Sequence, residues 1–358
     1  MRGSRDHFEG ARLWYFLYVC DHHFSIAYGR PPVIQEDITI TNHEKFLELP
    51  GTLQSDVRLH SQVAVFIILT RFYNHFGPDI EQAVTEADLI PLQQFAAALD
   101  DWSTKWCVRL TPPNPYVATY PLKGVHLHHF FGKLQVTSLA LRGIHQQSNM
   151  LDLSPQRRDL ANTAVNCALN ILQMSLGDPD LRNSVVGVPI YLHTMIAYSA
   201  VFLLKARQKS KTYNLNADSD LILDLVNQII DLLLRARAGE RHLSSHIATG
   251  LKKMLERMTS REASEKPGAG PLPSTHNNNN NSSSSSTDHG HGHGMGPDYL
   301  HSSSADAQMW GDHSYFGAPE SGILRMFDES VPYADEHFFP LGFFDAISAA
   351  PPPDMSYQ

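Results

Sequence analysis

Apolar residues recur every three to four positions along the first 259 residues, and this spacing predicts a body made of α-helices. No run of alternating apolar and polar residues indicates a strand. The densest stretch, ARLWYFLYVCDHHFSIAYGRPPVI, covers residues 11–34 and predicts the first helix. Its spacing places five apolar residues on one face: Leu13, Phe16, Cys20, Phe24 and Ala27. Four more apolar residues cover much of the other side: Trp14, Tyr15, Tyr18 and Val19. We therefore expect this helix to be buried on most sides.

Seven further helices follow from the same spacing. Ser55-Asp56 is the expected cap of the second helix, and Gly77-Pro78 its end. Ser154-Pro155 opens the fifth helix, and Asp218 or Ser219 opens the seventh. The seven helices are expected near residues 55–76, 92–106, 127–144, 155–175, 185–207, 218–232 and 241–258.

One of these helices imitates a membrane span. Residues 185–204 contain no Asp, Glu, Lys or Arg, which meets the length criterion for a bilayer crossing. Gly187, Pro189 and His193 dilute its hydrophobicity, however. We therefore expect a helix buried in a helical body, and no membrane partner.

The composition changes abruptly after the last predicted helix. Residues 260–323 form a linker rich in Asn, Ser, His and Gly, which cannot bury enough apolar surface to offset the entropy of ordering. Residues 324–358 mix acidic residues with bulky aromatic ones, a composition typical of transcriptional activation segments. We therefore divide the chain into a helical body (1–259), a disordered linker (260–323) and an acidic-aromatic segment (324–358).

Four phenylalanines are the predicted anchors of this last segment: Phe338, Phe339, Phe343 and Phe344. Three acidic residues would keep them solvated and assist encounter: Asp335, Glu336 and Asp345. The aromatic rings would then be buried in a groove of a coactivator protein, as an amphipathic stretch that folds on binding.

Charge and cysteine content exclude several classes of function. The first 259 residues carry 25 Lys and Arg against 24 Asp and Glu, and the remainder carries 3 against 13. Such a body does not present the clustered positive charge that binds phosphate backbones. The three cysteines, Cys20, Cys107 and Cys167, are too far apart for a zinc site or a disulfide framework, and we expect them to be buried apolar residues.

Histidine clusters are the strongest hints of chemistry, and we assign none of them a catalytic or metal role. Asp21-His22-His23 resembles signatures of metal phosphoesterases and of acyltransferases. The first needs strand-borne aspartates and the second needs a cysteine where Phe24 stands, so local hydrogen bonds at a helix end are the expected role. His126 and His129 share one helix face without a neighbouring carboxylate, and a histidine run at residues 289–293 lies in the linker. We expect no enzyme.

The segment from Arg12 to Pro32 carries a resemblance to a known family. It reads Arg-Leu-Trp-Tyr-x-Leu-Tyr-x-x-Asp-x-x-x-Ser and closes with Gly-Arg-Pro-Pro. This resembles the middle homology region of fungal zinc binuclear cluster transcription factors. The motif residues carried over are Arg12, Leu13, Trp14, Asp21, Gly29, Arg30, Pro31 and Pro32. Gly29 would permit a left-handed exit from the helix, and Arg30 would bond helix-end carbonyls or Asp21.

The resemblance implies a multi-helix regulatory domain, N-terminally incomplete, in a nuclear transcriptional regulator. The motif, the linker and the aromatic acidic end together resemble the members that activate genes of extracellular proteases in filamentous fungi. The family reads DNA through a six-cysteine cluster that holds zinc, and this chain lacks it. Zinc and DNA contacts are therefore expected only through an absent N-terminal module or a partner chain, and the oligomeric state stays open, with a homodimer among the options.

A second hypothesis stays open beside this one. A helical ligand-binding or scaffold protein without a transcriptional role would have the same all-α pattern. Nuclear localisation and transcriptional activity that depends on the acidic-aromatic segment would separate the two hypotheses.

Overall fold

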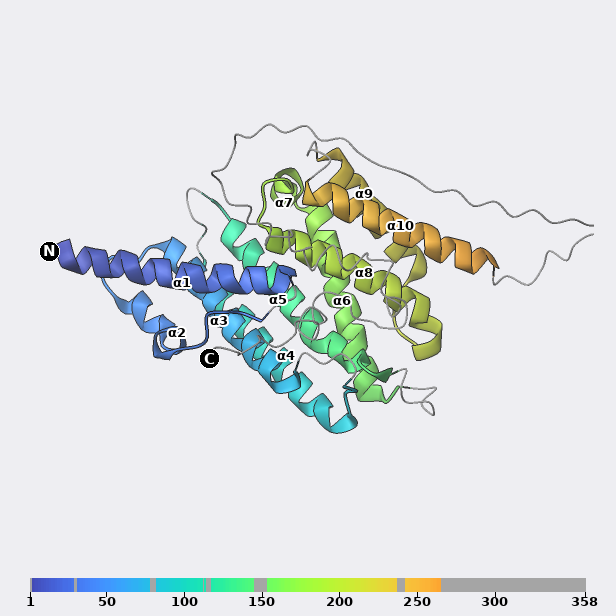
Figure 1. The fold of residues 1–358 in the computed structure, drawn as a ribbon, viewed down its shortest axis with the longest axis horizontal. Helices are drawn as coiled ribbons and strands as arrows, with labels where there is room; N and C mark the ends of the chain where they lie inside the picture. The colour runs from blue at the N-terminus through green and yellow to red at the C-terminus, as the bar shows by residue number, and fades with distance from the viewer. Residues whose placement is uncertain are drawn as a thin grey trace, which may run out of the picture. The chain divides into compact units, whose positions relative to one another are not determined.

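The computed structural model describes residues 2–28, 31–77, 82–111, 113, 117–144, 153–236 and 242–264. The described part contains helices and loops and no β-strand, so the predicted all-α class is confirmed (Figure 1). The α-helices are α1 (Arg2–Tyr28), α2 (Ile38–Thr41), α3 (Gln54–Phe76), α4 (Leu89–Arg109), α5 (Tyr120–Ser138), α6 (Pro155–Gly177), α7 (Pro179–Ser184), α8 (Ile190–Tyr213), α9 (Ser219–Arg235) and α10 (Leu243–Ser264). Three short 3₁₀ helices are η1 (His43–Glu48), η2 (Glu86–Asp88) and η3 (Leu139–Leu141).

All packing described below lies within one compact unit that includes residues 1–259; the last turn of α10 belongs to a second unit. Helix α6 is central, because it packs against α5, α8 and α9. Helix α4 covers another side of α5, and α1 lies on α3 and α8. One continuous apolar core runs through these contacts.

Local sequence signals set most helix ends. The Ser154 hydroxyl accepts a hydrogen bond from the Arg157 backbone N–H at the start of α6. Asp218 caps α9 by accepting from the backbone of Asp220 and Leu221. Gly77 ends α3 with φ at +68°, a left-handed conformation that glycine adopts without strain. These predicted caps are confirmed.

Helix α8 is the segment that resembled a membrane span. Its residues from Tyr191 to Ala206 are all buried, so the side chains that reach solvent at its C-terminal end lie in its last two turns. Helices α1, α5, α6 and α9 pack around it. Within the described residues, no helix combines the length and apolarity that a bilayer crossing requires. The prediction of a buried helix at this position is confirmed.

The expectation that the first helix is buried on most sides is wrong. Helix α1 turns Tyr15, Tyr18 and Val19 into the core, whereas Leu13, Phe16 and Phe24 on its other face are exposed. Leu13 is 57% exposed and Phe24 is 51% exposed, and Cys20 is half-buried. Periodicity alone could not select the inner face, because apolar residues occupy two opposite sides of this helix.

Three smaller expectations also need correction. Asp56 does not cap α3 from outside, because the helix already begins at Gln54. The elements α2, η1 and α7 were not predicted, since each is too short to show periodicity. Of the three cysteines only Cys167 is buried, and burial raises the pKa of its thiol to about 12. The linker and the acidic-aromatic segment, with Phe338, Phe339, Phe343 and Phe344, lie outside the described residues.

Candidate functional site

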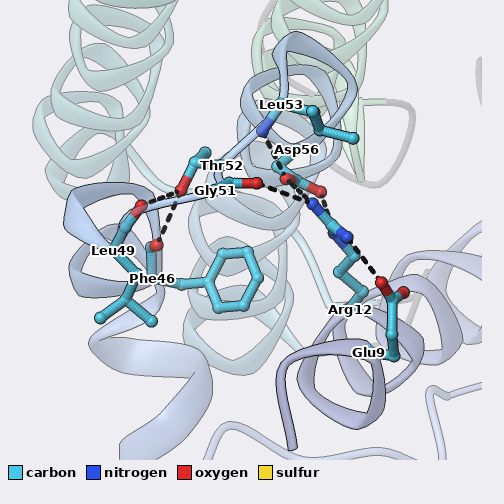
Figure 2. Close-up of polar contacts among 8 residues, drawn as sticks. All are labelled: Glu9, Arg12, Phe46, Leu49, Gly51, Thr52, Leu53 and Asp56. Atoms are coloured by element: carbon cyan, nitrogen blue, oxygen red, sulfur yellow. Dashed lines mark hydrogen bonds and ion pairs between the residues drawn. The ribbon is translucent and has the colours of Figure 1, made fainter. Parts of the chain in front are cut away.

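An ion pair joins the family motif to the second long helix. The Arg12 guanidinium in α1 donates from Nε to Asp56 Oδ1 at 2.8 Å and from Nη2 to Asp56 Oδ2 at 2.7 Å (Figure 2). Two parallel hydrogen bonds of this kind are stronger and more specific than a single contact. The Asp56 side chain is 4% exposed and that of Arg12 is 20% exposed, so water screens the pair only from one side.

Neighbouring groups saturate both members of the pair. Arg12 also donates to Glu9 Oε1 at 2.9 Å and to the Gly51 carbonyl at 3.3 Å. Asp56 accepts in addition the Leu53 backbone N–H at 2.8 Å, one of the N–H groups that a helix start leaves without an intrahelical acceptor. Burial alone would raise the pKa of Asp56, but the Arg12 and Leu53 hydrogen bonds outweigh it, so this pKa is lowered.

Aromatic rings fix the arginine from its other side. The Phe8 ring lies 4.4 Å from the guanidinium carbon of Arg12 and stacks on Phe46 with centroids 4.5 Å apart. Thr52 donates to the Leu49 carbonyl at 2.7 Å and to the Phe46 carbonyl at 3.3 Å (Figure 2). The loop between η1 and α3 is thereby tied to the same point as α1.

A groove of about 450 Å³ opens beside this pair, between α1 and α3. Apolar side chains of Leu13, Phe16 and Leu59 line it, and the polar residues are Glu9, Arg12, Ser55, Asp56, Arg58 and Gln62. The Arg58 guanidinium lies over the Tyr120 ring at 5.6 Å. This arrangement suits the burial of one bulky apolar side chain, with polar groups around it, as in a protein-docking site.

The groove has charged side chains of both signs among its lining residues. Its charged residues are Glu9, Arg12, Asp56 and Arg58, and Arg12 forms ion pairs with both Glu9 and Asp56. The groove-lining residues contain no cysteine or histidine that could act as nucleophile or base. Within the described residues, no group of three or more His, Cys, Asp or Glu side chains is placed to hold a metal ion.

The structure separates the residues of the family motif into different tasks. Arg12 makes the ion pair, Leu13 lines the groove, and Trp14 packs partly buried against the core. Asp21 accepts the Ile34 backbone N–H at 2.8 Å and so holds the chain that follows the Gly-Arg-Pro-Pro turn. Pro31 and Pro32 lie in irregular chain before α2.

Two residues of that turn, Gly29 and Arg30, lie outside the described residues. The expected bond from Arg30 to Asp21 or to helix-end carbonyls therefore stays a prediction.

His22 and His23 are structural groups within α1. His22 is buried, with Nδ1 2.8 Å from the Tyr18 carbonyl and Nε2 3.1 Å from the Thr70 hydroxyl. Burial lowers its pKa. The His23 ring stacks on Tyr191 with centroids 4.4 Å apart. The expected local hydrogen bond is present for His22, although both residues precede the last turn of the helix rather than end it.

The second histidine run is divided between core and surface. His128 is buried and pairs through Nδ1 with the Gly124 carbonyl at 2.7 Å, and burial lowers its pKa to about 4. His129 Nε2 lies 2.7 Å from Asp100 Oδ1 of α4, next to Lys133. The sequence pattern missed this carboxylate because it comes from another helix.

Arg157 is a structural residue that the sequence did not reveal. Its side chain is almost fully buried and donates to the carbonyls of Ala140 and Val84, both at 2.8 Å, and to Glu86 Oε1 at 2.9 Å. It therefore connects α6 with η3 and with η2 and the residues just before it. The only hint in the sequence was an arginine in the first turn of a predicted helix, together with Glu86. Because arginines are common on helix surfaces, this hint did not indicate a buried side chain.

Comparison with known proteins shows similarity to a curated fungal protein. The chain is 49% identical over 276 residues to the transcriptional activator of proteases prtT of Emericella nidulans. No family model matches the chain. No solved structure matches it either. The similarity covers 75% of this chain and 42% of prtT, so the chain spans less than half the length of that relative and is similar to part of a fungal transcription factor.

Proposed function

We propose that this protein acts as a transcriptional activator of extracellular protease genes in a filamentous fungus. The observation that carries the proposal is the 49% identity to prtT over three quarters of the chain. The groove between α1 and α3, with apolar side chains and polar groups around them, suits protein docking and so supports a regulatory role. The activity implies a location in the nucleus.

The body fits the middle homology region of zinc binuclear cluster factors. Arg12 and Asp21, two charged residues of the motif, each bind a segment outside α1, which suits a motif retained for the fold of this region. Cys20, Cys107 and Cys167 cannot form the six-cysteine cluster. Zinc and DNA binding therefore belong, in this proposal, to another module or to a partner chain.

The acidic-aromatic segment 324–358 supplies the activating contact in this mechanism. Phe338, Phe339, Phe343 and Phe344 become buried in a coactivator groove, while Asp335, Glu336 and Asp345 increase the rate of encounter through long-range attraction to a basic surface. The helical body carries the regulatory contacts.

A reporter assay tests this division of roles. The full chain and a chain ending at residue 323 are each fused to a heterologous DNA-binding domain upstream of a reporter gene. We expect activation by the full chain and its loss in the shorter one. Replacing the four phenylalanines by alanine should abolish activation, whereas alanine at the four serines 282–285 of the linker, an equal number of changes, should preserve it.

A genetic experiment tests the target genes. Disrupting the reading frame in the fungus that carries it should lower the transcripts of secreted proteases and leave housekeeping transcripts unchanged. Unchanged protease transcripts would refute the proposed target class. Failure of the full-chain reporter, with the fusion present in the nucleus, would favour the ligand-binding or scaffold alternative.

A further inference from the structure

Three polar side chains meet where α1, α5 and α8 come together. His23 belongs to α1, His128 to α5 and Tyr191 to α8, and α8 packs against both other helices. The ring centroids of His23 and Tyr191 are 4.4 Å apart, and those of His128 and Tyr191 are 5.2 Å apart. The two histidine rings are 5.9 Å apart. We call these three residues the His-Tyr cluster, and the proposed function gives it no task.

Each member of the His-Tyr cluster carries a polar atom that has no hydrogen-bond partner among the described residues. These atoms are His23 Nε2, His128 Nε2 and Tyr191 Oη, and each of them is shielded from solvent. Tyr191 is 3% exposed and His128 is 8% exposed. An unpaired buried polar atom loses its hydration without compensation, so folded proteins pair almost all such atoms with protein groups or with bound water. Three of them in one place indicate a bound molecule.

Apolar rings separate the cluster from other polar groups. The Phe66 ring of α3 lies edge-on to both histidines, with centroids 5.1 Å from His23 and 6.1 Å from His128. It is also 5.8 Å from Tyr191, and the Phe131 ring lies 5.6 Å from Tyr191. Both phenylalanines are fully buried. A phenyl ring has no N–H or O–H group and no lone pair, so these neighbours cannot supply the missing partners.

The hydrogens of the cluster define what the bound molecule must offer. His128 Nδ1 lies 2.7 Å from the Gly124 carbonyl, which can only accept, so Nδ1 carries the hydrogen. Burial lowers the pKa of His128 to about 4, so the ring is neutral at pH 7 and its Nε2 is an acceptor. Burial raises the pKa of Tyr191, so its phenol keeps its hydrogen and can donate. The molecule must therefore donate to His128 and can accept from Tyr191.

The charges around the cluster disfavour an ion. Arg58 lowers the pKa of both His23 and His128, and no carboxylate of the described residues offsets it. A metal cation would be buried beside two neutral imidazoles without compensating negative charge, which is costly. An anion would face the lone pair of His128 Nε2. A neutral molecule that both donates and accepts hydrogen bonds has neither disadvantage.

Water meets these requirements. One water molecule can donate to His128 Nε2, accept from the Tyr191 hydroxyl, and pair with His23 Nε2 in either tautomer of that ring. Two hydrogen bonds of about 2.8 Å span up to about 5.6 Å, and the ring centroids lie at separations of this size. We propose that the His-Tyr cluster binds an internal water molecule that joins α1, α5 and α8 through three hydrogen bonds.

This site gives a role to the second histidine of the Asp-His-His run. His23 holds α1 to the body through a shared water, whereas His22 does so through Thr70. A water with three protein partners is part of the structure and exchanges slowly with solvent. The inference does not depend on the proposed function.

Relaxation dispersion of the ¹⁷O and ²H signals of the solvent tests the proposal, because it counts the water molecules that a protein holds in its interior. The full chain is compared with the double variant Tyr191→Phe/His128→Leu. We expect the variant to hold one internal water fewer, since His23 alone does not provide the two or more partners that a buried water needs. The control is Tyr15→Phe, because Tyr15 is a buried tyrosine whose hydroxyl donates to the Thr39 carbonyl at 3.3 Å. It should leave the count unchanged.

NMR of the imidazole rings tests the same hydrogen bonds in the unaltered cluster, so the proposal stays testable if the double variant does not fold. At pH 7 the ¹⁵N signals of His128 should show hydrogen on Nδ1, with Nε2 shifted upfield from a free acceptor nitrogen. A nuclear Overhauser effect should connect the water signal with ring protons of His128 and Tyr191.

Three outcomes would overturn the proposal. The first is an unchanged number of internal waters in a folded double variant. The second is a His128 ring with hydrogen on Nε2, or one without any Overhauser effect from water, which would point to a direct bond within the cluster. The third is a titration in which the full chain binds one equivalent of Zn²⁺ and the double variant binds none, which would assign the cluster to a cation.

Discussion

Replacing Arg12 by alanine is the sharpest test of the α1–α3 junction. The change removes two short hydrogen bonds from the Asp56 carboxylate and leaves it buried with the Leu53 N–H. Removing one partner of a fully buried ion pair costs about 3–5 kcal/mol. Because Arg12 is 20% exposed, water can reach part of the vacated space, and we expect a loss of about 2–3 kcal/mol in unfolding free energy.

Urea denaturation followed by far-UV circular dichroism measures this loss. The control is Arg71→Ala, because Arg71 is 57% exposed and makes a single bond to Glu36 at 3.1 Å. An exposed pair of this kind contributes about 0–1 kcal/mol. A value for Arg12→Ala no larger than that for Arg71→Ala would refute the structural role assigned to the motif arginine.

The pH dependence provides an independent check. The pKa of Asp56 is lowered in the folded state, so its contribution to stability is present above the unfolded pKa, near 4, and is lost as the pH falls through the folded pKa. In Arg12→Ala the lowering hydrogen bond is gone, and burial then favours the protonated carboxyl. The gap in unfolding free energy between wild type and variant should therefore narrow as the pH falls from about 6 to about 3. A gap independent of pH would contradict this mechanism.

Three further predictions concern the interior. Gly143→Ala should destabilise the protein strongly, because Gly143 has φ at +72° and a Cβ there would lie 2.4 Å from the Ala83 Cα. The control is Gly124→Ala in α5, where a Cβ meets no atom within 4 Å and the change should be neutral or stabilising by up to about 1 kcal/mol. Thermal melts compare the two variants. Arg157→Met should cost about 3 kcal/mol in urea denaturation, because two buried carbonyls lose their donor; a cost under about 1 kcal/mol would contradict the connecting role. Burial of His60 lowers its pKa to about 4, so as the pH falls the unfolded chain binds the proton first and the unfolding free energy should decrease between pH 7 and pH 5. His60→Gln should make that decrease smaller by on the order of 1–2 kcal/mol. An unchanged decrease would mean that His60 titrates normally.

Local sequence signals predicted where the helices lie in the chain better than which face of each helix is buried. Ser154 and Asp218 cap helices where their sequence context placed them, because capping depends on residues within one turn. The inner face of α1 could not be predicted in this way. Both of its faces are apolar, and only the positions of α3 and α8 decide which one is buried.

The candidate site was only partly visible in the sequence. Arg12 was singled out by the family resemblance, but its partner Asp56 lies 44 residues away and was interpreted as a helix cap. The carbonyls bound by Arg157 belong to backbone, whose position no side-chain pattern encodes. Contacts made across elements therefore required the structure.

The enclosure of α8 has a consequence for how the body is synthesised. Its apolar surface is covered by α1 and α6, which leave the ribosome before it, and by α9, which leaves after it. A nascent chain that has just completed α8 thus exposes the part of its apolar surface that α9 covers later. We expect this intermediate to bind chaperones, and fragments that end before α9 to aggregate.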